Sequence, residues 1–167
     1  FRSEYKKIKW ENSSARFRAW SEGKTGFPIV DAGMRHRVTT RSALVAGGLT
    51  IAIAAYQVAL AAGAPFGQHA WGGRLDDDVL SPALRVGSVV AAVILVWMAG
   101  VILARADLIG INPVPRRWLG RTTWVIAAYM VLNTIGNLTS PSDVERFVFG
   151  PATIVIAVCA AIVARRG

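Results

Sequence analysis

The stretch ALVAGGLTIAIAAYQVALAAGA at positions 43–64 decides the class of this protein. It carries no charged side chain over its whole length, and Pro65 follows it directly. A helix needs about 20 mainly apolar residues to cross the hydrocarbon core of a bilayer, and about 17–25 are tolerated. The stretch therefore predicts a membrane-spanning helix rather than a core helix of a soluble domain.

Three further uncharged runs, at 86–104, 122–138 and 147–164, repeat this pattern along the chain. Lipid offers no partner to open backbone groups, so the runs should be helical, and four strands could not close a barrel. We expect an all-α fold, a bundle of four transmembrane helices preceded by a short basic cytoplasmic segment. We divide the chain into a head, residues 1–35, and a membrane body, residues 36–167.

The overall composition points the same way. Of the 167 residues, 53% are hydrophobic and only 17% are charged, against about 25% charged in an average soluble domain. This apolar excess excludes a disordered chain, which needs low hydrophobicity. The single cysteine, Cys159, excludes an internal disulfide framework and a cysteine zinc site.

The basic residues predict an orientation. Of the 19 lysines and arginines, sixteen lie before the first run, between the second and third runs, or after the fourth. Positive loops stay on the cytoplasmic side, so both termini should be cytoplasmic in the inner membrane of a bacterium. A competing interpretation takes the first run as a secretory signal cleaved after Ala64, but that run is longer than a usual signal core.

Two asparagines interrupt the third run. Asn133 and Asn137 are four residues apart and share one helix face with Gly136. They could form a polar site for a solute, together with Gln57 of the first run, or they could simply hydrogen-bond a neighbouring helix. We therefore name Gln57, Asn133 and Asn137 as intramembrane polar candidates.

No other pattern in the sequence indicates catalysis. His69 and the acidic run Asp76, Asp77 and Asp78 could hold a cation, but they lack the spacing of a calcium loop. The chain also lacks a nucleophile–base set, paired catalytic carboxylates and a phosphate-binding glycine loop. We expect no catalytic residue, no cofactor-binding residue and no metal ligand.

The head carries one specific motif, WSEGKTGFPIVDAGMR at positions 20–35. It resembles the run Trp-x-x-Gly-x-Thr-Gly-x-Pro-x-Val-Asp-Ala-x-Met-Arg in the helical flavin-binding domain of the cryptochrome/photolyase family. The resemblance implies that Trp10 occupies the place of the outermost tryptophan that passes electrons to the flavin. It implies FAD as cofactor and DNA as partner only if this short segment is functional.

The sequence departs from that family after Arg35. His36 to Thr40 lead directly into the first apolar run, where the family continues into its flavin pocket. About 35 residues are also fewer than a domain usually needs to fold unaided. We expect that the head binds no FAD and repairs no DNA by itself.

The body resembles small uncharacterised four-helix bacterial membrane proteins, through GAPFG at 63–67, AWGG at 70–73 and NTIGN at 133–137. That resemblance implies no activity. The chain is interpreted as a photolyase-like segment fused to a small membrane protein that Met34 could begin.

Three hypotheses for function follow. The first is a non-catalytic membrane protein that acts through the bilayer, through a second copy or through other membrane proteins. The second is a small-solute transporter or channel component that uses the polar candidates. The third is a flavin-dependent DNA photolyase, represented here by a fragment.

Overall fold

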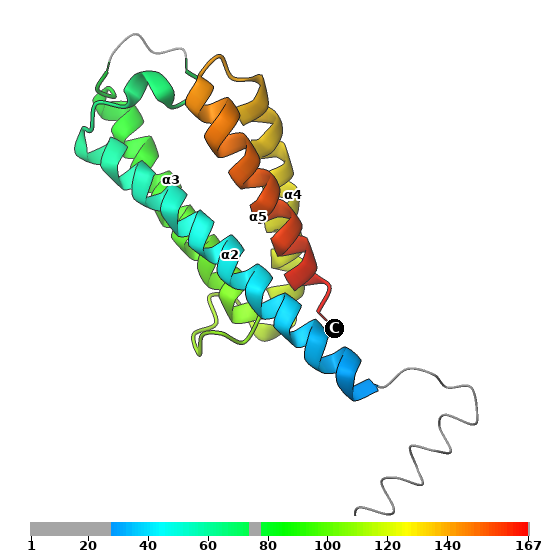
Figure 1. Ribbon diagram of the computed structural model, residues 1–167. Helices are drawn as coiled ribbons and strands as arrows, with labels where there is room; N and C mark the ends of the chain where they lie inside the picture. The colour runs from blue at the N-terminus through cyan, green and yellow to red at the C-terminus, as the bar shows by residue number, and fades with distance from the viewer. Residues whose placement is uncertain (1–27, 74–77, 167) are drawn as a thin grey trace, which may run out of the picture. The chain divides into compact units, whose positions relative to one another are not determined.

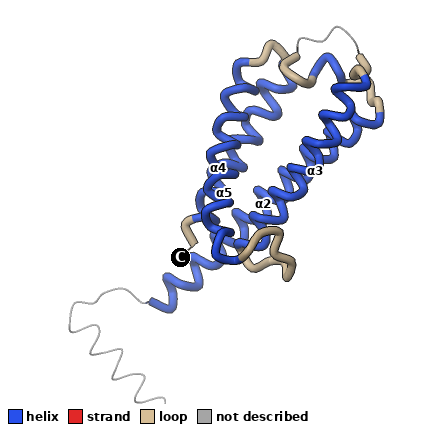
Figure 2. Tube along the Cα trace, turned by 180° about the vertical axis from the view of Figure 1, so that it is seen from behind, coloured by secondary structure: helices blue, strands red, loops and turns tan. Residues whose placement is uncertain are grey.

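The computed structural model describes residues 28–73 and 78–166 (Figure 1). The predicted all-α class is confirmed for these residues, which form helices and loops and no strand (Figure 2). The four long helices are α2 (Pro28–Ala62), α3 (Pro82–Arg105), α4 (Arg116–Thr139) and α5 (Gly150–Ala164). Two short elements, a 3₁₀ turn η1 (Gly67–His69) and a π turn η2 (Glu145–Phe149), lie between them.

The chain separates into two compact units, Phe1–His36 and Arg37–Gly167. The second unit, hereafter the bundle, contains most of α2 and all of the other helices. The photolyase-like motif up to Phe27, with Trp10, lies outside the described residues.

Glycine and proline set where the helices of the bundle begin and end. At the end of α2, Gly63 adopts a φ of 95°, and its N–H and that of Ala64 bond back to the carbonyls of Leu60 and Ala59. This is the Schellman ending, which favours glycine because a Cβ is strained at positive φ. Helix α3 then starts with Pro82, whose missing N–H costs nothing in the first turn.

The widened turn before α5 has a similar cause. Pro151 has no N–H to donate, and its ring would clash with the carbonyl four residues earlier in a regular helix. Gly150 instead donates its N–H to the carbonyl of Glu145, five residues back. The resulting π turn places Glu145 at the start of a helical rod that continues through α5.

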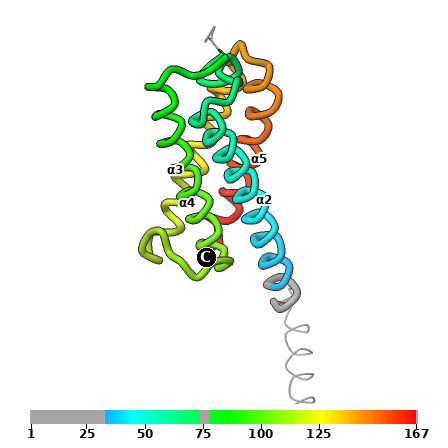
Figure 3. The backbone as a smooth tube through the Cα atoms, turned by 90° about the vertical axis from the view of Figure 1, so that its left-hand side faces the viewer, coloured from blue at the N-terminus to red at the C-terminus, as the bar shows by residue number. Residues whose placement is uncertain are grey.

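Within the bundle, successive helices run antiparallel. Residues 63–73 and 78–81 and the connection 140–144 lie at one end, and the connection 106–115 lies at the other end with the close of α5 (Figures 1 and 3). Helices α4 and α5 pack extensively against each other. The pairs α2/α3 and α4/α5 diverge toward the end with the 63–81 connection (Figures 1 and 2).

Small residues allow close packing in the core of the bundle. Ala43, Ala46 and Ala160 are completely buried, together with Val101 and Ile102. A Cβ on Gly47 would lie 3.1 Å from the Leu103 side chain, so glycine permits this approach of α2 to α3. Buried hydroxyls satisfy themselves on their own helices, as Thr50 does by donating to the Ala46 carbonyl at 2.7 Å.

Three helical segments of the described chain are long and apolar enough to cross a membrane, namely Gly33–Ala62, Pro82–Arg105 and Glu145–Ala164. The fourth predicted span, 122–138, forms the greater part of α4, but α4 does not reach the same apolarity. The mean hydropathy of α4 is lowered by Asn133 and Asn137 and by the arginines of its first turns. Of the four predicted spans, those at 43–64, 86–104 and 147–164 overlap these three segments, and the span at 122–138 does not.

Candidate binding pocket between the helices

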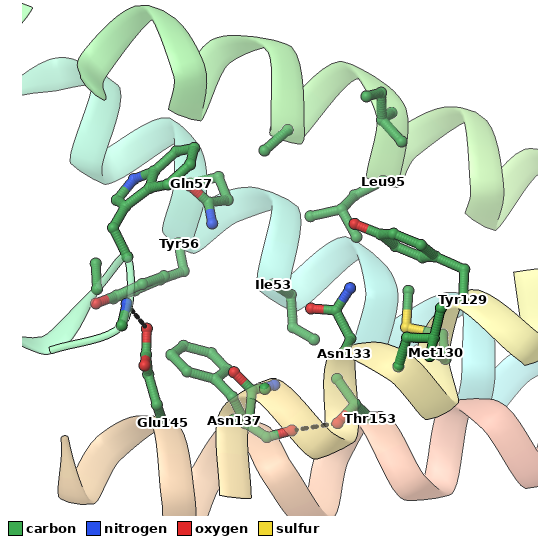
Figure 4. A pocket seen from close by; sticks show the side chains of 18 of the residues that line it. Ile53, Tyr56, Gln57, Leu95, Tyr129, Met130, Asn133, Asn137, Glu145 and Thr153 are labelled. Atoms are coloured by element: carbon green, nitrogen blue, oxygen red, sulfur yellow. Dashed lines mark hydrogen bonds between the residues drawn. The ribbon is translucent and has the colours of Figure 1, made fainter. Parts of the chain in front are cut away.

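A pocket of about 810 Å³ opens where the two helix pairs diverge (Figure 4). All four helices contribute to its lining, as do the 70–72 connection and the π turn. Most of its walls are aliphatic or aromatic, and a few polar side chains reach it. This combination is typical of small-molecule sites. The lining residues with a hydroxyl, amide or carboxylate group are Tyr56, Gln57, Tyr129, Asn133, Asn137, Glu145 and Thr153.

The structure brings all three predicted polar candidates to this pocket. Gln57 comes from α2, whereas Asn133 and Asn137 come from successive turns of α4. Among the described residues, no hydrogen bond joins any of these side chains to a neighbouring helix. The Oε1 atom of Gln57 is buried without a hydrogen-bond partner.

Tyr56 is a pocket residue that the sequence analysis left out. Its ring packs against Phe149 with 4.9 Å between centroids, and against Phe66 at 6.3 Å. Its hydroxyl is buried and has no partner among the described residues. A tyrosine inside an apolar run is usually a packing residue, so the sequence predicted only its neighbour Gln57 as a polar candidate.

Glu145 is the second missed residue, and it is buried, with 8% of its surface exposed. Its Oε1 accepts a hydrogen bond from the Gly72 N–H at 3.0 Å, and its own N–H donates to Ser142 Oγ at 3.4 Å. Figure 4 shows the Glu145 carboxylate and the Tyr56 hydroxyl pointing to the same side of the pocket. Its sequence signal was weak, since an acidic residue just before an apolar run usually faces water.

The 63–81 connection closes the pocket from one end through Trp71. This residue adopts a φ of 55° and donates its indole N–H to Ser88 Oγ at 3.2 Å. Gly87 makes room for the indole, because a Cβ there would lie 2.9 Å from the ring. The neighbouring Gly72 and Gly73 also have positive φ, so the connection can turn sharply toward Glu145.

A pair of threonines joins α4 to α5 beside the pocket. The Thr134 hydroxyl lies 2.9 Å from the Thr153 hydroxyl, and both hydroxyls also bond to carbonyls one turn earlier in their own helices. These two side chains are fully satisfied, unlike Tyr56 and Gln57. The threonine pair therefore joins α4 to α5, whereas the unpaired Tyr56 hydroxyl and Gln57 Oε1 mark a place where a ligand could bind.

The opposite end of the bundle is basic. Asp107, at a φ of 56° after α3, pairs with Arg166 at 3.0 Å and with Arg116 at 3.7 Å. Arg121 lies over the Trp118 ring, 5.0 Å from its centroid. Asp107 thus pairs with two arginines at this end of the bundle.

In the described part of the chain, no three histidine, cysteine or acidic side chains gather as a metal site would require. Asp76 and Asp77 lie outside that part. Asp78 accepts a hydrogen bond from Gln68 at 2.8 Å on its side chain and one from the Gly67 N–H on its carbonyl, so it helps to shape the loop.

The described part of the photolyase-like region does not fit FAD. Residues 28–40 are helical, and the side chains of residues 33–38 are exposed. A flavin needs walls that enclose it and several converging polar groups. This helical stretch supplies no such enclosure, so we derive no chemistry through a flavin.

Comparison with known proteins finds a match for the head. The family described as FAD binding domain of DNA photolyase matches residues 1–40. Deoxyribodipyrimidine photo-lyase of Buchnera aphidicola is 63% identical over 30 residues, which cover 18% of this chain and 6% of that protein. The Synechococcus enzyme of the same name is 48% identical over 40 residues, covering 24% and 8%.

The Escherichia coli deoxyribodipyrimidine photo-lyase is 50% identical over 34 residues, or 20% of this chain and 7% of the enzyme. This chain therefore covers less than a tenth of these relatives. No solved structure matches it. The predicted resemblance is confirmed: the first 40 residues are similar to a short piece of the photolyase FAD-binding domain.

Proposed function

We propose that the bundle is a four-span membrane protein that binds a small molecule between its helices without catalysing a reaction on it. The observation that carries this proposal is the pocket on which Gln57, Asn133 and Asn137 converge from two helices. An unpaired polar group buried in a protein costs about 1–3 kcal/mol. Gln57 Oε1 is such a group, and a ligand that pairs with it would recover part of that cost.

The distribution of polarity supports a membrane location. The interior holds hydroxyl side chains such as Thr50, Ser88 and Thr123, all completely buried. The outer surface carries large apolar side chains far in excess of the patches found on soluble monomers. On α4 these exposed residues are Trp124, Val125, Leu132, Ile135 and Leu138.

This distribution also favours α4 as a fourth span. The asparagines that lower its apolarity line the pocket, whereas Val125 and Ile135, which do not line it, are 67% and 56% exposed. A helix whose polar residues face a cavity can cross a bilayer with an apolar face toward lipid. The average hydropathy of the helix does not record this separation of its faces.

The arginines support the predicted orientation. Arg105, Arg116, Arg121 and Arg166 lie at the end of the bundle that also carries Trp118, whereas Glu145 and Asp78 lie at the other. Basic residues stay in the cytoplasm, and tryptophans prefer the headgroup region. The proposed topology therefore has the basic end in the cytoplasm of a bacterial cell and the pocket in the outer half of the membrane.

Binding of a neutral, environment-sensitive dye such as N-phenyl-1-naphthylamine to the purified protein in lipid nanodiscs tests this proposal. We expect saturable binding that the double substitution Asn133→Leu, Asn137→Leu weakens at least tenfold, because two leucines remove polar groups and fill space. Asn112→Leu, at an exposed position of the 106–115 connection, is the matched control.

Equal dye binding by the double variant and the Asn112→Leu control would contradict the proposal. A protein that binds no dye would also contradict it. That result would favour a structural role instead, through a second copy of the chain or other membrane proteins.

The similarity of the head to photolyases favours a second candidate, a flavin-dependent DNA-repair function of a longer protein. An absorbance spectrum of the purified 167-residue chain tests it. We expect no flavin bands, because the helical part of the matched segment offers no enclosure. A stoichiometric flavin spectrum would support the second candidate and would make Trp10 an electron-transfer residue.

A further inference from the structure

We propose that the ligand of this pocket is a lipophilic organic cation and that Glu145 is its counter-charge. This inference rests on the proposed function, because it names the class of molecule that the same pocket takes. Three observations support it: the surroundings of the carboxylate, the aromatic walls, and the side of the bundle on which the pocket opens.

The Glu145 carboxylate lines the pocket but lacks a cationic neighbour within the described residues. The adjacent Arg146 instead donates to the Ser140 carbonyl at 3.0 Å. Arg85, the other described arginine at this end, donates to the Ala61 carbonyl at 2.8 Å. A buried carboxylate is costly unless it is paired, and in membrane proteins such a group marks a functional site.

One oxygen of Glu145 is held by the Gly72 N–H, which fixes the direction of the carboxylate. This bond leaves the second oxygen without a hydrogen bond from any described group. A positively charged ligand in the pocket would meet this oxygen.

Aromatic rings form the walls near this carboxylate. Tyr56, Trp71 and Phe149 all line the pocket, and the first and last are in contact. The face of an aromatic ring attracts a cation through its quadrupole, and the attraction grows when water is excluded. The buried Gln57 Oε1 adds an unpaired acceptor, whereas an anionic ligand would meet only repulsion from Glu145.

The route into the pocket explains why the cation should be lipophilic. Five large side chains line the pocket and are also exposed: Val90 and Ile94 of α3, Tyr129 and Leu132 of α4, and Trp71 at the end of the pocket. The pocket therefore opens sideways between α3 and α4. In the proposed orientation this opening faces the bilayer, so a ligand would arrive from the lipid.

Radiolabelled tetraphenylphosphonium is the probe, with tetraphenylborate as the anion of nearly the same shape. Both are measured on the full chain in nanodiscs of zwitterionic lipid, in parallel with the neutral dye. Glu145→Gln removes the charge and keeps a carbonyl oxygen for the Gly72 N–H. Asp143→Asn, an exposed carboxylate on the 140–144 connection, is the matched control for total charge.

We expect saturable tetraphenylphosphonium binding by the natural chain and by Asp143→Asn, and at least tenfold weaker binding by Glu145→Gln. Dye binding by Asp143→Asn should change less than twofold, and dye binding by Glu145→Gln should fall much less than its cation binding. Equal cation binding by Glu145→Gln, or equal competition by tetraphenylborate, would overturn the inference. Dye binding without cation binding would overturn it and leave the proposed function standing, whereas the absence of both would overturn the two together.

Discussion

The two ends of the bundle are built from the same four helices but are held together differently. At the basic end, alanines and a glycine let α2 approach its neighbours, and Ile102 and Val163 are completely buried. At the other end the helix pairs separate around about 810 Å³ of space, and a loop held by Trp71 and Glu145 closes it. Dense apolar packing fixes one end, whereas a small apolar cluster of Leu60, Ala70 and Leu80 and a few polar bonds hold the other.

Because of this difference, stability should depend mainly on the packed end of the bundle and binding mainly on the end with the pocket. A packed core loses free energy when atoms are removed, because a cavity remains. A pocket that already contains space has less to lose from the same truncation. Substitutions at the two ends should therefore separate an effect on unfolding from an effect on binding.

The largest effect should come from Ile102→Ala at the packed end. Removing a buried isoleucine side chain usually costs about 2–5 kcal/mol of unfolding free energy. Unfolding of the detergent-purified protein with increasing denaturing detergent, followed by circular dichroism, measures it. The matched change Ile94→Ala, at the exposed mouth of the pocket, should cost less than half as much. Equal costs would mean that the two ends are packed alike.

Gly87→Ala should have the next largest effect, at the pocket end. The new Cβ would lie 2.9 Å from the Trp71 ring, so the indole must shift and its bond to Ser88 weakens. Such overpacking costs about 1–3 kcal/mol. Gly48→Ala, where a Cβ meets nothing within 4 Å, is the control. A stability equal to that of the control would show that Trp71 does not close the pocket.

Glu145→Gln should change stability little. Without a ligand, the substitution removes a buried charge while keeping the acceptor for Gly72, so the unfolding free energy should stay level or rise by about 1 kcal/mol. Glu145→Ala should instead lose stability, because it leaves the Gly72 N–H unpaired. A large loss in the glutamine variant would show that the charge itself holds the loop.

Asp107→Asn at the basic end should have the smallest effect. The substitution removes ion pairs with Arg116 and Arg166, but exposed pairs contribute about 1 kcal/mol or less. Asparagine also tolerates the positive φ of this position. Salt screens such pairs, so the difference from the natural chain should vanish near 1 M salt. A difference that persists there would indicate a role beyond charge.

The helices and the photolyase-like motif of the head could be predicted from the sequence, because each depends on residues that are neighbours in the chain. An uncharged run long enough to span a bilayer is recognised without knowing its neighbours, and residues four apart share a helix face wherever the helix packs. Asn133 and Asn137 were found in this way. The average hydropathy of the third run, however, does not show that the asparagines of α4 line the pocket while apolar residues such as Val125 are exposed on another face.

The all-α class, the apolar runs, the bias of the basic residues and the photolyase-like motif could be predicted from the sequence, because each depends on residues close together in the chain. The packing of the helices, in contrast, places Gln57 in the same pocket as the two asparagines and leaves the Tyr56 hydroxyl without a partner among the described residues. It also decided that Glu145 is buried rather than solvated. The burial of Glu145 depends on Gly72, which lies 73 positions away in the chain and donates its N–H to the carboxylate. Packing between distant segments, and not a local sequence pattern, brings such residues together.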